Sequence, residues 1–173
     1  MEIDERQLSQ LITRIIKLLC AENKPKKKIY MIFNQNWSEK YNSFLESICE
    51  NDKCEIYAVV PLNIKYNERL KEFPVFEKIL TRNEISSHNL ENYITVFPVT
   101  PRNIIVKTAL CIDDTFESRW ILDSIGKGER VILISKGFDK FTGKEPEAYI
   151  QKMLEYYRML LRFDIEIQDI LKI

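Results

Sequence analysis

Four short apolar segments, separated by stretches with helical periodicity, constrain the fold of this chain most strongly. They lie at residues 29–33, 54–60, 93–97 and 131–135. A strand reads as a continuous apolar run when both of its faces are covered, as they are in a parallel sheet. Parallel strands need long crossover connections, which helices usually provide. The alternation therefore predicts a doubly wound, Rossmann-like parallel sheet in a three-layer α/β/α fold.

Cap and periodicity signals place helices between these strands. Ser38 is a good N-cap for one helix, Gly126 ends another and Pro146 begins the last. The predicted helices cover residues 38–48, 101–112, 115–125 and a long segment after 146. A short strand is further predicted at 75–80, a helical turn at 84–90 and an edge strand at 163–167.

Residues 1–22 are predicted to form an amphipathic helix that precedes the domain. Asp4 with Gln7 three residues later matches a capping box. Apolar residues then recur with helical spacing at Leu8, Leu11, Ile12, Ile15, Leu18 and Leu19. A basic linker at 23–28 follows, and the α/β domain takes residues 29–173.

Charge and cysteine content exclude several classes of function. Lys+Arg and Asp+Glu are balanced at 26 each, so nothing indicates a nucleic-acid partner or a membrane partner. No signal peptide and no apolar window of transmembrane length is recognised, so we expect a soluble, cytoplasmic protein. With His88 as the sole histidine, a Cys/His zinc site is not expected. The cysteines fall in apolar patterns without CxxC pairing, as small buried hydrophobes do, at Cys20, Cys49, Cys54 and Cys111.

Three loops follow strands at the carboxyl edge of the predicted sheet, at residues 34–38, 98–103 and 135–142. Sheets of this kind bind ligands at that edge, near helix N-termini. In the middle loop, Thr100 can cap the next helix and Pro101 suits its first turn. Arg102 offers a fork for a carboxylate or phosphate, and Asn103 can both donate and accept hydrogen bonds. The alternative is a plain helix start with a solvated arginine.

The segment that begins at this loop resembles the flavoprotein family of flavin-dependent cysteine decarboxylases, flavin prenyltransferases and the dipicolinate synthase B subunit. Its pattern, P-x-[ST]-x-N-T-x-x-K-x-A-x-G-I-x-D, is matched with one extra loop residue at Pro98-Val99-Thr100, Asn103, Lys107, Ala109, Ile112 and Asp114. The resemblance implies an FMN across the strand ends, a substrate carboxylate oriented by Asn103, and a trimer-based homo-oligomer. The residues implied to surround the FMN are Asn34, Gln35, Asn36, Trp37, Ser38, Pro98, Val99, Thr100 and Arg102.

Three departures from the family narrow this function. The loop at 34–38 lacks the glycines that let backbone amides approach a phosphate. Glu84 stands where the decarboxylases have a catalytic histidine, and no cysteine flap follows Ser135. Decarboxylation of a cysteine peptide is therefore not expected, and we predict a redox or flavin-handling protein, an oxidoreductase or a lyase. The alternatives are an assembly module that has lost FMN and an enzyme that holds another anionic ligand through Arg102.

Two further features have competing interpretations. Trp37 either stacks on a flavin ring or base or packs as a lid on the first helix. Asp113 and Asp114 could suggest a metal pair, but neighbours on a helix point apart. We therefore expect no metal there, and a cap for the next helix at Thr115.

The N-terminal segment resembles the encapsulation peptides of enzymes packed inside bacterial microcompartments. Asp4-Glu5-Arg6-Gln7-Leu8, followed by Leu11-Ile12 and Ile15-Ile16, carries this resemblance. It implies a location in a microcompartment, with shell or cargo proteins as partners of residues 1–20. A helix that packs on its own domain or forms oligomers has the same stripe, so both interpretations stay open.

Overall fold

Six parallel strands form the sheet in the computed structural model, which describes residues 9–14, 26–34, 36–48, 54–62, 68–85 and 90–172. The strands are β1 (Lys27–Ile32), β2 (Cys54–Val60), β3 (Lys78–Thr81), β4 (Tyr93–Phe97), β5 (Arg130–Ile134) and β6 (Glu166–Gln168). Their order is β3-β2-β1-β4-β5-β6, and each neighbouring pair is parallel. The predicted doubly wound parallel sheet is therefore confirmed.

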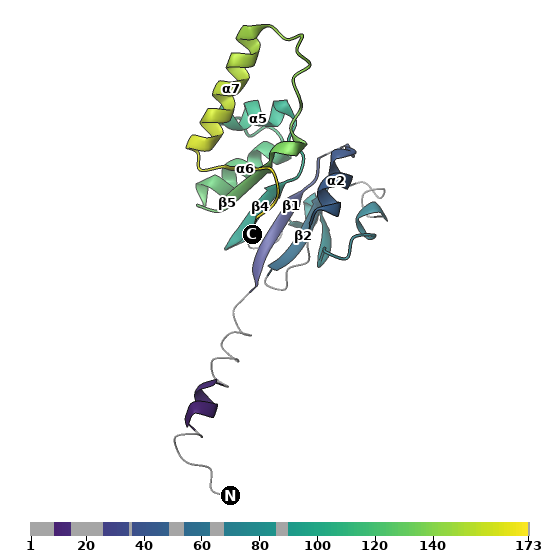
Figure 1. The fold of residues 1–173 in the computed structure, drawn as a ribbon, viewed down its shortest axis with the longest axis vertical. Helices are drawn as coiled ribbons and strands as arrows, with labels where there is room; N and C mark the ends of the chain where they lie inside the picture. Colours follow the sequence, from purple (N-terminus) through teal and green to yellow (C-terminus); the bar gives the residue numbers. More distant parts are fainter. Residues whose placement is uncertain are drawn as a thin grey trace, which may run out of the picture.

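Helices cover both faces of this sheet (Figure 1). They are α2 (Lys40–Glu46), α4 (Arg82–Ile85), α5 (Arg102–Ala109), α6 (Phe116–Gly126) and α7 (Glu147–Arg162), with the short 3-10 helix η1 (Ser135–Gly137). α2 contributes Tyr41 and Phe44 to the core on one face. α5, α6 and α7 contribute Ile105, Ile121 and Leu160 to the core on the other. The three-layer α/β/α arrangement follows from these two cores.

β1 joins the two cores through the alternation of its side chains. Ile29 and Met31 are fully buried in the core that contains α2, whereas Tyr30 and Ile32 are buried in the core that contains α5, α6 and α7. Successive side chains of a strand point to opposite faces, so a strand covered on both faces must be apolar throughout. Burying each aliphatic side chain contributes about 1.5–3 kcal/mol. The unbroken apolar run in the sequence has this physical origin.

Two local predictions are wrong, and one is confirmed. Thr100 does not cap α5, because Pro101 is the N-cap residue, with φ −62° and ψ 154°, and Thr100 is fully buried. Cys111 is exposed rather than a small buried hydrophobe, since α5 ends at Ala109 and the chain turns with a left-handed Cys111 (φ 55°). Thr115 caps α6 through a capping box, as the sequence predicts.

Residues 9–14 are helical, in agreement with the predicted N-terminal helix, and Leu11 and Ile12 are 60% and 48% exposed there. The division of the chain at residues 22 and 28 stays a prediction. Across the described part of the chain, no helix is long and apolar enough to cross a membrane. Further predictions concern residues that lie outside the described ranges. These are the capping box of Asp4 and Gln7, the apolar positions Leu8, Ile15, Leu18 and Leu19, and the residues Cys20, Gln35, Cys49 and His88.

Gly137→Ala is expected to destabilise the protein, because Gly137 packs directly against the backbone of Pro98. A Cβ at Gly137 would lie 1.9 Å from the Pro98 carbonyl oxygen. Urea titration should show the free energy of unfolding falling by about 2–3 kcal/mol.

Gly126→Ala is the matched control for this substitution. In the described part of the chain, no atom outside the adjacent residues and the helix backbone lies within 4 Å of a Cβ at Gly126, the last residue of α6. Helix propensity predicts a gain of up to about 1 kcal/mol there. Equal effects of the two substitutions would show that contact with Pro98 does not limit stability.

Candidate functional site

The order of strands changes direction between β1 and β4. β2 and β3 lie on one side of β1, and β4, β5 and β6 lie on the other. The loops after β1 and β4 lead to α2 and α5, whose side chains enter the cores on opposite faces of the sheet. Because these loops diverge, a crevice opens at the carboxyl ends of the two strands, where doubly wound sheets bind ligands.

A pocket of about 390 Å³ lies in this crevice, and we call it the switch-point pocket. It is lined by Asn34, Asn36, Trp37, Ser38, Lys40, Val99, Pro101, Asn103, Ile104, Thr115, Glu117 and Asp139. The first two predicted loops therefore meet, as expected for neighbouring parallel strands. The predicted site residues that line the pocket are Asn34, Asn36, Trp37, Ser38, Val99 and Asn103.

Three other predicted site residues do not line the switch-point pocket. Pro98 borders a separate cavity. Thr100 is fully buried, and its hydroxyl has no hydrogen-bond partner among the described residues. Arg102 instead contacts the connection between β5 and α7, where its Nη2 donates to the Lys140 carbonyl oxygen at 2.7 Å and its guanidinium lies 4.7 Å from the centre of the Phe141 ring. The fork predicted for an anionic ligand is thus engaged within the chain.

Asn34 fastens the two central loops to each other. Its backbone N–H donates to the Tyr41 hydroxyl at 2.9 Å, and its side-chain Nδ2 donates to the Val99 carbonyl oxygen at 2.8 Å. Tyr41 is itself fully buried in the core beside α2. Asn34 therefore fixes the separation of the loops after β1 and β4, and its backbone amide is already bonded.

Lys40 and Asp139 attach the third predicted loop to the pocket. Lys40 Nζ donates to the carbonyl oxygens of Gly137 at 3.2 Å and Phe138 at 2.9 Å, and it lies 3.2 Å from Asp139 Oδ1. Asp139 Oδ2 accepts a hydrogen bond from the Arg102 N–H at 3.2 Å. Arg102 is the first residue of α5, so the Asp139 carboxylate lies at the positive end of that helix.

A largely buried ion pair holds the carboxylate of Glu117. Arg82 Nη2 lies 2.5 Å from Glu117 Oε1, and the two side chains are 18% and 10% exposed. The same nitrogen donates to the Phe33 carbonyl oxygen at 3.1 Å, and the guanidinium lies 4.5 Å from the centre of the Phe116 ring. The pair connects the end of β1 with α4 and α6. Removing either partner would leave a buried charge without its counter-ion, which is costly.

Trp37 makes packing contacts and also lines the pocket. Its ring lies nearly parallel to that of Phe33, with centroids 6.4 Å apart, and the Arg69 guanidinium carbon is 5.0 Å from the centre of its ring. The side chain is half-buried and also contacts Tyr41, with ring centroids 5.2 Å apart. These contacts are those expected from the packing interpretation of Trp37, and its place in the pocket wall keeps the ligand interpretation open.

Glu84 and Asp114 have local structural roles. Glu84 is exposed and accepts from the backbone N–H and the hydroxyl of Thr81 at 2.6 and 2.8 Å, which holds the turn into α4. Asp114 pairs with Lys107 at 2.8 Å. Among the described residues, no group of His, Cys, Asp or Glu is arranged to hold a metal ion.

The sequence did not identify Lys40, Glu117 or Asp139 as pocket residues. Lys40 lies two residues after the predicted ligand loop at 34–38, and Asp139 lies within the predicted loop at 135–142. Their positions in or beside these loops could have identified them as pocket residues. Nothing in the sequence marks Glu117, because its ion-pair partner is 35 residues away on another element.

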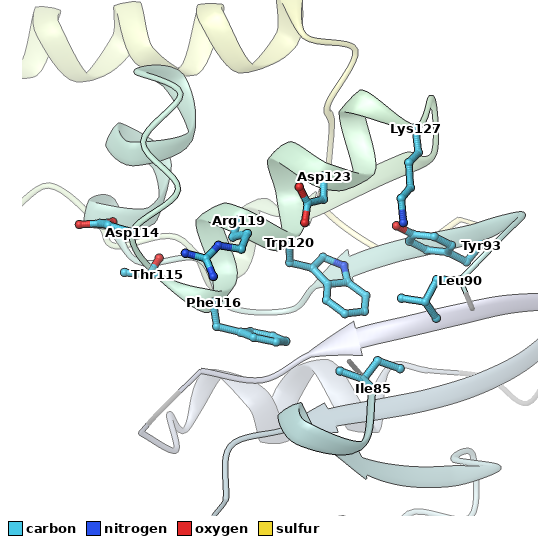
Figure 2. A pocket seen from close by; sticks show the side chains of 10 residues that line it. All are labelled: Ile85, Leu90, Tyr93, Asp114, Thr115, Phe116, Arg119, Trp120, Asp123 and Lys127. Carbon is cyan, nitrogen blue, oxygen red and sulfur yellow. The ribbon is translucent and has the colours of Figure 1, made fainter. Parts of the chain in front are cut away.

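A second pocket, of about 400 Å³, borders α6 (Figure 2). Its polar aromatic groups are already paired: Trp120 Nε1 donates to Thr95 Oγ1 at 2.9 Å, and the Tyr93 hydroxyl shares a hydrogen bond with Ser124 at 3.1 Å. Tyr93 is the first residue of β4, so this pocket reaches the amino end of the strand rather than the carboxyl end. The switch-point pocket is therefore the better candidate site.

Comparisons with known proteins identify the fold through solved structures. No family model and no curated protein sequence matches the chain. A dodecameric FMN-dependent Ubix-like decarboxylase from Escherichia coli O157:H7 is 14% identical, with a TM-score of 0.54 over 82% of this chain and 77% of that one. The peptidyl-cysteine decarboxylase EpiD is 16% identical, with a TM-score of 0.53 over 83% of this chain and 85% of that one.

AnUbiX (PadA1), in a complex with FMN and dimethylallyl pyrophosphate, is 10% identical to the chain. Its TM-score is 0.54, over 83% of this chain and 77% of that one. These likenesses confirm, at the level of the fold, the flavoprotein resemblance predicted from the motif that begins at Pro98.

Thr100→Val is expected to stabilise the protein, because a buried hydroxyl without a partner is replaced by a methyl group of similar size. We expect the free energy of unfolding in urea to rise by about 1 kcal/mol. Thr95→Val is the matched control, since Thr95 is equally buried but accepts from Trp120. It should lose about 1–3 kcal/mol by leaving the indole N–H unsatisfied. An equal loss of unfolding free energy in both variants would show that the Thr100 hydroxyl does have a hydrogen-bond partner.

Glu145 gives the loop before α7 a predictable acid sensitivity. The Thr142 backbone N–H donates to both carboxylate oxygens at 3.0 Å, which lowers the pKa of Glu145 from 4.5 to about 2. A carboxyl whose pKa is lower in the folded state stabilises the protein above about pH 4.5 and loses that effect as pH falls toward 2. Unfolding measured between pH 2 and 5 should show a weaker acid dependence in Glu145→Gln. An unchanged profile would exclude this role.

Proposed function

We propose that this chain, which has the fold of the FMN-dependent flavoproteins, binds a flavin in the switch-point pocket. The observation that carries the proposal is the meeting of two loops that are far apart in the sequence. Asn34, Asn36 and Trp37 from one loop, with Val99 and Asn103 from the other, line one pocket at the ligand-binding edge of the sheet.

The chemistry of the pocket suits the ring system of a flavin. Its volume of about 390 Å³ is within the range of small-molecule sites. Asn36 and Asn103 are exposed, and their amides can both donate to and accept from the polar edge of a heterocycle. Val99 and Ile104 supply apolar contacts beside Trp37. A bound flavin would supply electron-transfer chemistry, and these residues would bind and orient it.

The proposed reaction class is redox or flavin handling rather than decarboxylation of a cysteine peptide. The solved neighbours include decarboxylases and a protein in a complex with FMN and dimethylallyl pyrophosphate, so likeness to them does not by itself select a reaction. Glu84 makes local bonds to Thr81 and does not line the pocket. Asn103, in the first turn of α5, is our candidate for orienting a polar group of the substrate.

We also propose that the protein works as a homo-oligomer built from trimers. The Escherichia coli neighbour is dodecameric. Leu11 and Ile12 on the N-terminal helix are 60% and 48% exposed, which supports a role in contacts with other chains. Those chains are further copies of this protein or, in the microcompartment hypothesis, shell or cargo proteins.

Absorption spectroscopy tests flavin binding most directly. The purified protein is expected to be yellow, or to quench the fluorescence of added riboflavin or FMN. Asn103→Ala should weaken that binding by about 3- to 10-fold, the scale of one hydrogen bond.

Asn83→Ala is the control, because Asn83 is exposed on α4 and does not line the pocket. A colourless protein that binds neither flavin would overturn the proposal and favour the assembly module. Equal weakening by both substitutions would remove Asn103 from the site.

A further inference from the structure

We propose that the switch-point pocket selects flavins that lack a phosphate, because a carboxylate of the chain already occupies the position suited to one. This inference rests on the proposed function and specifies its ligand as the uncharged isoalloxazine class, of which riboflavin is an example. Asp139 is the residue that makes the selection. It does so by engaging the two groups of the pocket best suited to an anion, the Lys40 ammonium and the start of α5.

The first of these groups is the N-terminal end of α5. Free backbone N–H groups at such an end bind phosphates readily. Here the N–H of Arg102, the first residue of α5, donates to Asp139 Oδ2 at 3.2 Å. A phosphate at this helix end would have to displace the carboxylate or share the amide with it.

The second group is Lys40, the sole cation among the described residues that line the pocket. Its ammonium has three donors, and three acceptors surround it: the carbonyl oxygens of Gly137 and Phe138 and the Asp139 carboxylate. All three donors of the Lys40 ammonium therefore bond to groups of the chain, and its charge is paired with Asp139.

Two described backbone amides at the ends of the connection between β1 and α2 are already engaged. The Asn34 N–H donates to the Tyr41 hydroxyl, and the Lys40 N–H donates to Ser38 Oγ at 3.3 Å. Glycines that would let a phosphate approach the backbone are also missing from the sequence of this loop.

The described charges at the pocket are compensated within the chain, so none of them is left to attract an anion. The charged residues of the described lining are Lys40, Glu117 and Asp139, and Lys40 pairs with Asp139. The ion pair with Arg82 compensates Glu117 but does not supply a free positive charge. A phosphate monoester brings a charge of about −1.5 to −2 at neutral pH. Beside Lys40 and the start of α5 it would be repelled by the Asp139 carboxylate and would find no uncompensated cation in the described lining, whereas the neutral ring needs none.

Fluorescence titration of the full chain with riboflavin, and separately with FMN, tests the selection. Riboflavin should bind about tenfold more tightly than FMN in low salt, and the difference should shrink as added salt screens the repulsion. Inorganic phosphate alone should not compete with riboflavin.

Asp139→Asn should strengthen FMN binding about tenfold by freeing Lys40 and removing one negative charge, while riboflavin affinity stays within about twofold. Asp123→Asn is the control, because it changes the net charge equally from an exposed position on α6 outside the pocket. It should leave both affinities unchanged.

The outcomes separate this inference from the proposed function. FMN binding as tight as riboflavin binding, or an equal response of both flavins to Asp139→Asn, would overturn the selection while leaving the flavin site in place. Failure of both flavins to bind would overturn the proposed function and this inference with it.

Discussion

β1 pairs in parallel with β2 on one side and with β4 on the other, and this pairing determines where the rest of the site lies. Because β4 follows β3 in the chain yet lies on the opposite side of β1, the loops after β1 and β4 are brought together at one edge. The helices that follow them contribute to different cores, so the loops cannot close over each other. Asn34 holds the crevice at a fixed width by bonding to Val99.

The charged residues around this crevice act mainly as connections between elements. Lys40 links α2 to the loop after β5, Arg82 links α4 to α6, and Arg102 links α5 to the loop before α7. A pocket whose charges are paired in this way is preorganised, since its side chains need little rearrangement to keep their geometry. Because the charged groups are paired, neutral side-chain amides, chiefly those of Asn36 and Asn103, are the groups that can form hydrogen bonds with a ligand.

The shared fold and the individual residues carry different information about function. The chain shares its fold with the solved structures although only 10–16% of the aligned residues are identical. A fold can support many activities, so the chemistry must come from the site itself. The absence of glycine from the sequence of the first loop and the position of Asp139 are features of this chain, and the proposed choice between flavins depends on them.

The sequence by itself determined the parallel sheet, the alternation of its strands and helices, and the edge of the sheet that carries the candidate site. Those features depend on local periodicity and on the burial of whole strands, both of which are visible in short stretches of sequence. For this reason β2 and β4 have the predicted bounds. Only the tertiary structure decided which side chains face the pocket. Arg102 turned toward Lys140, Thr100 was buried instead of capping α5, and Asp139 reached the start of that helix. These outcomes depend on contacts between residues far apart in the chain, which no local pattern encodes.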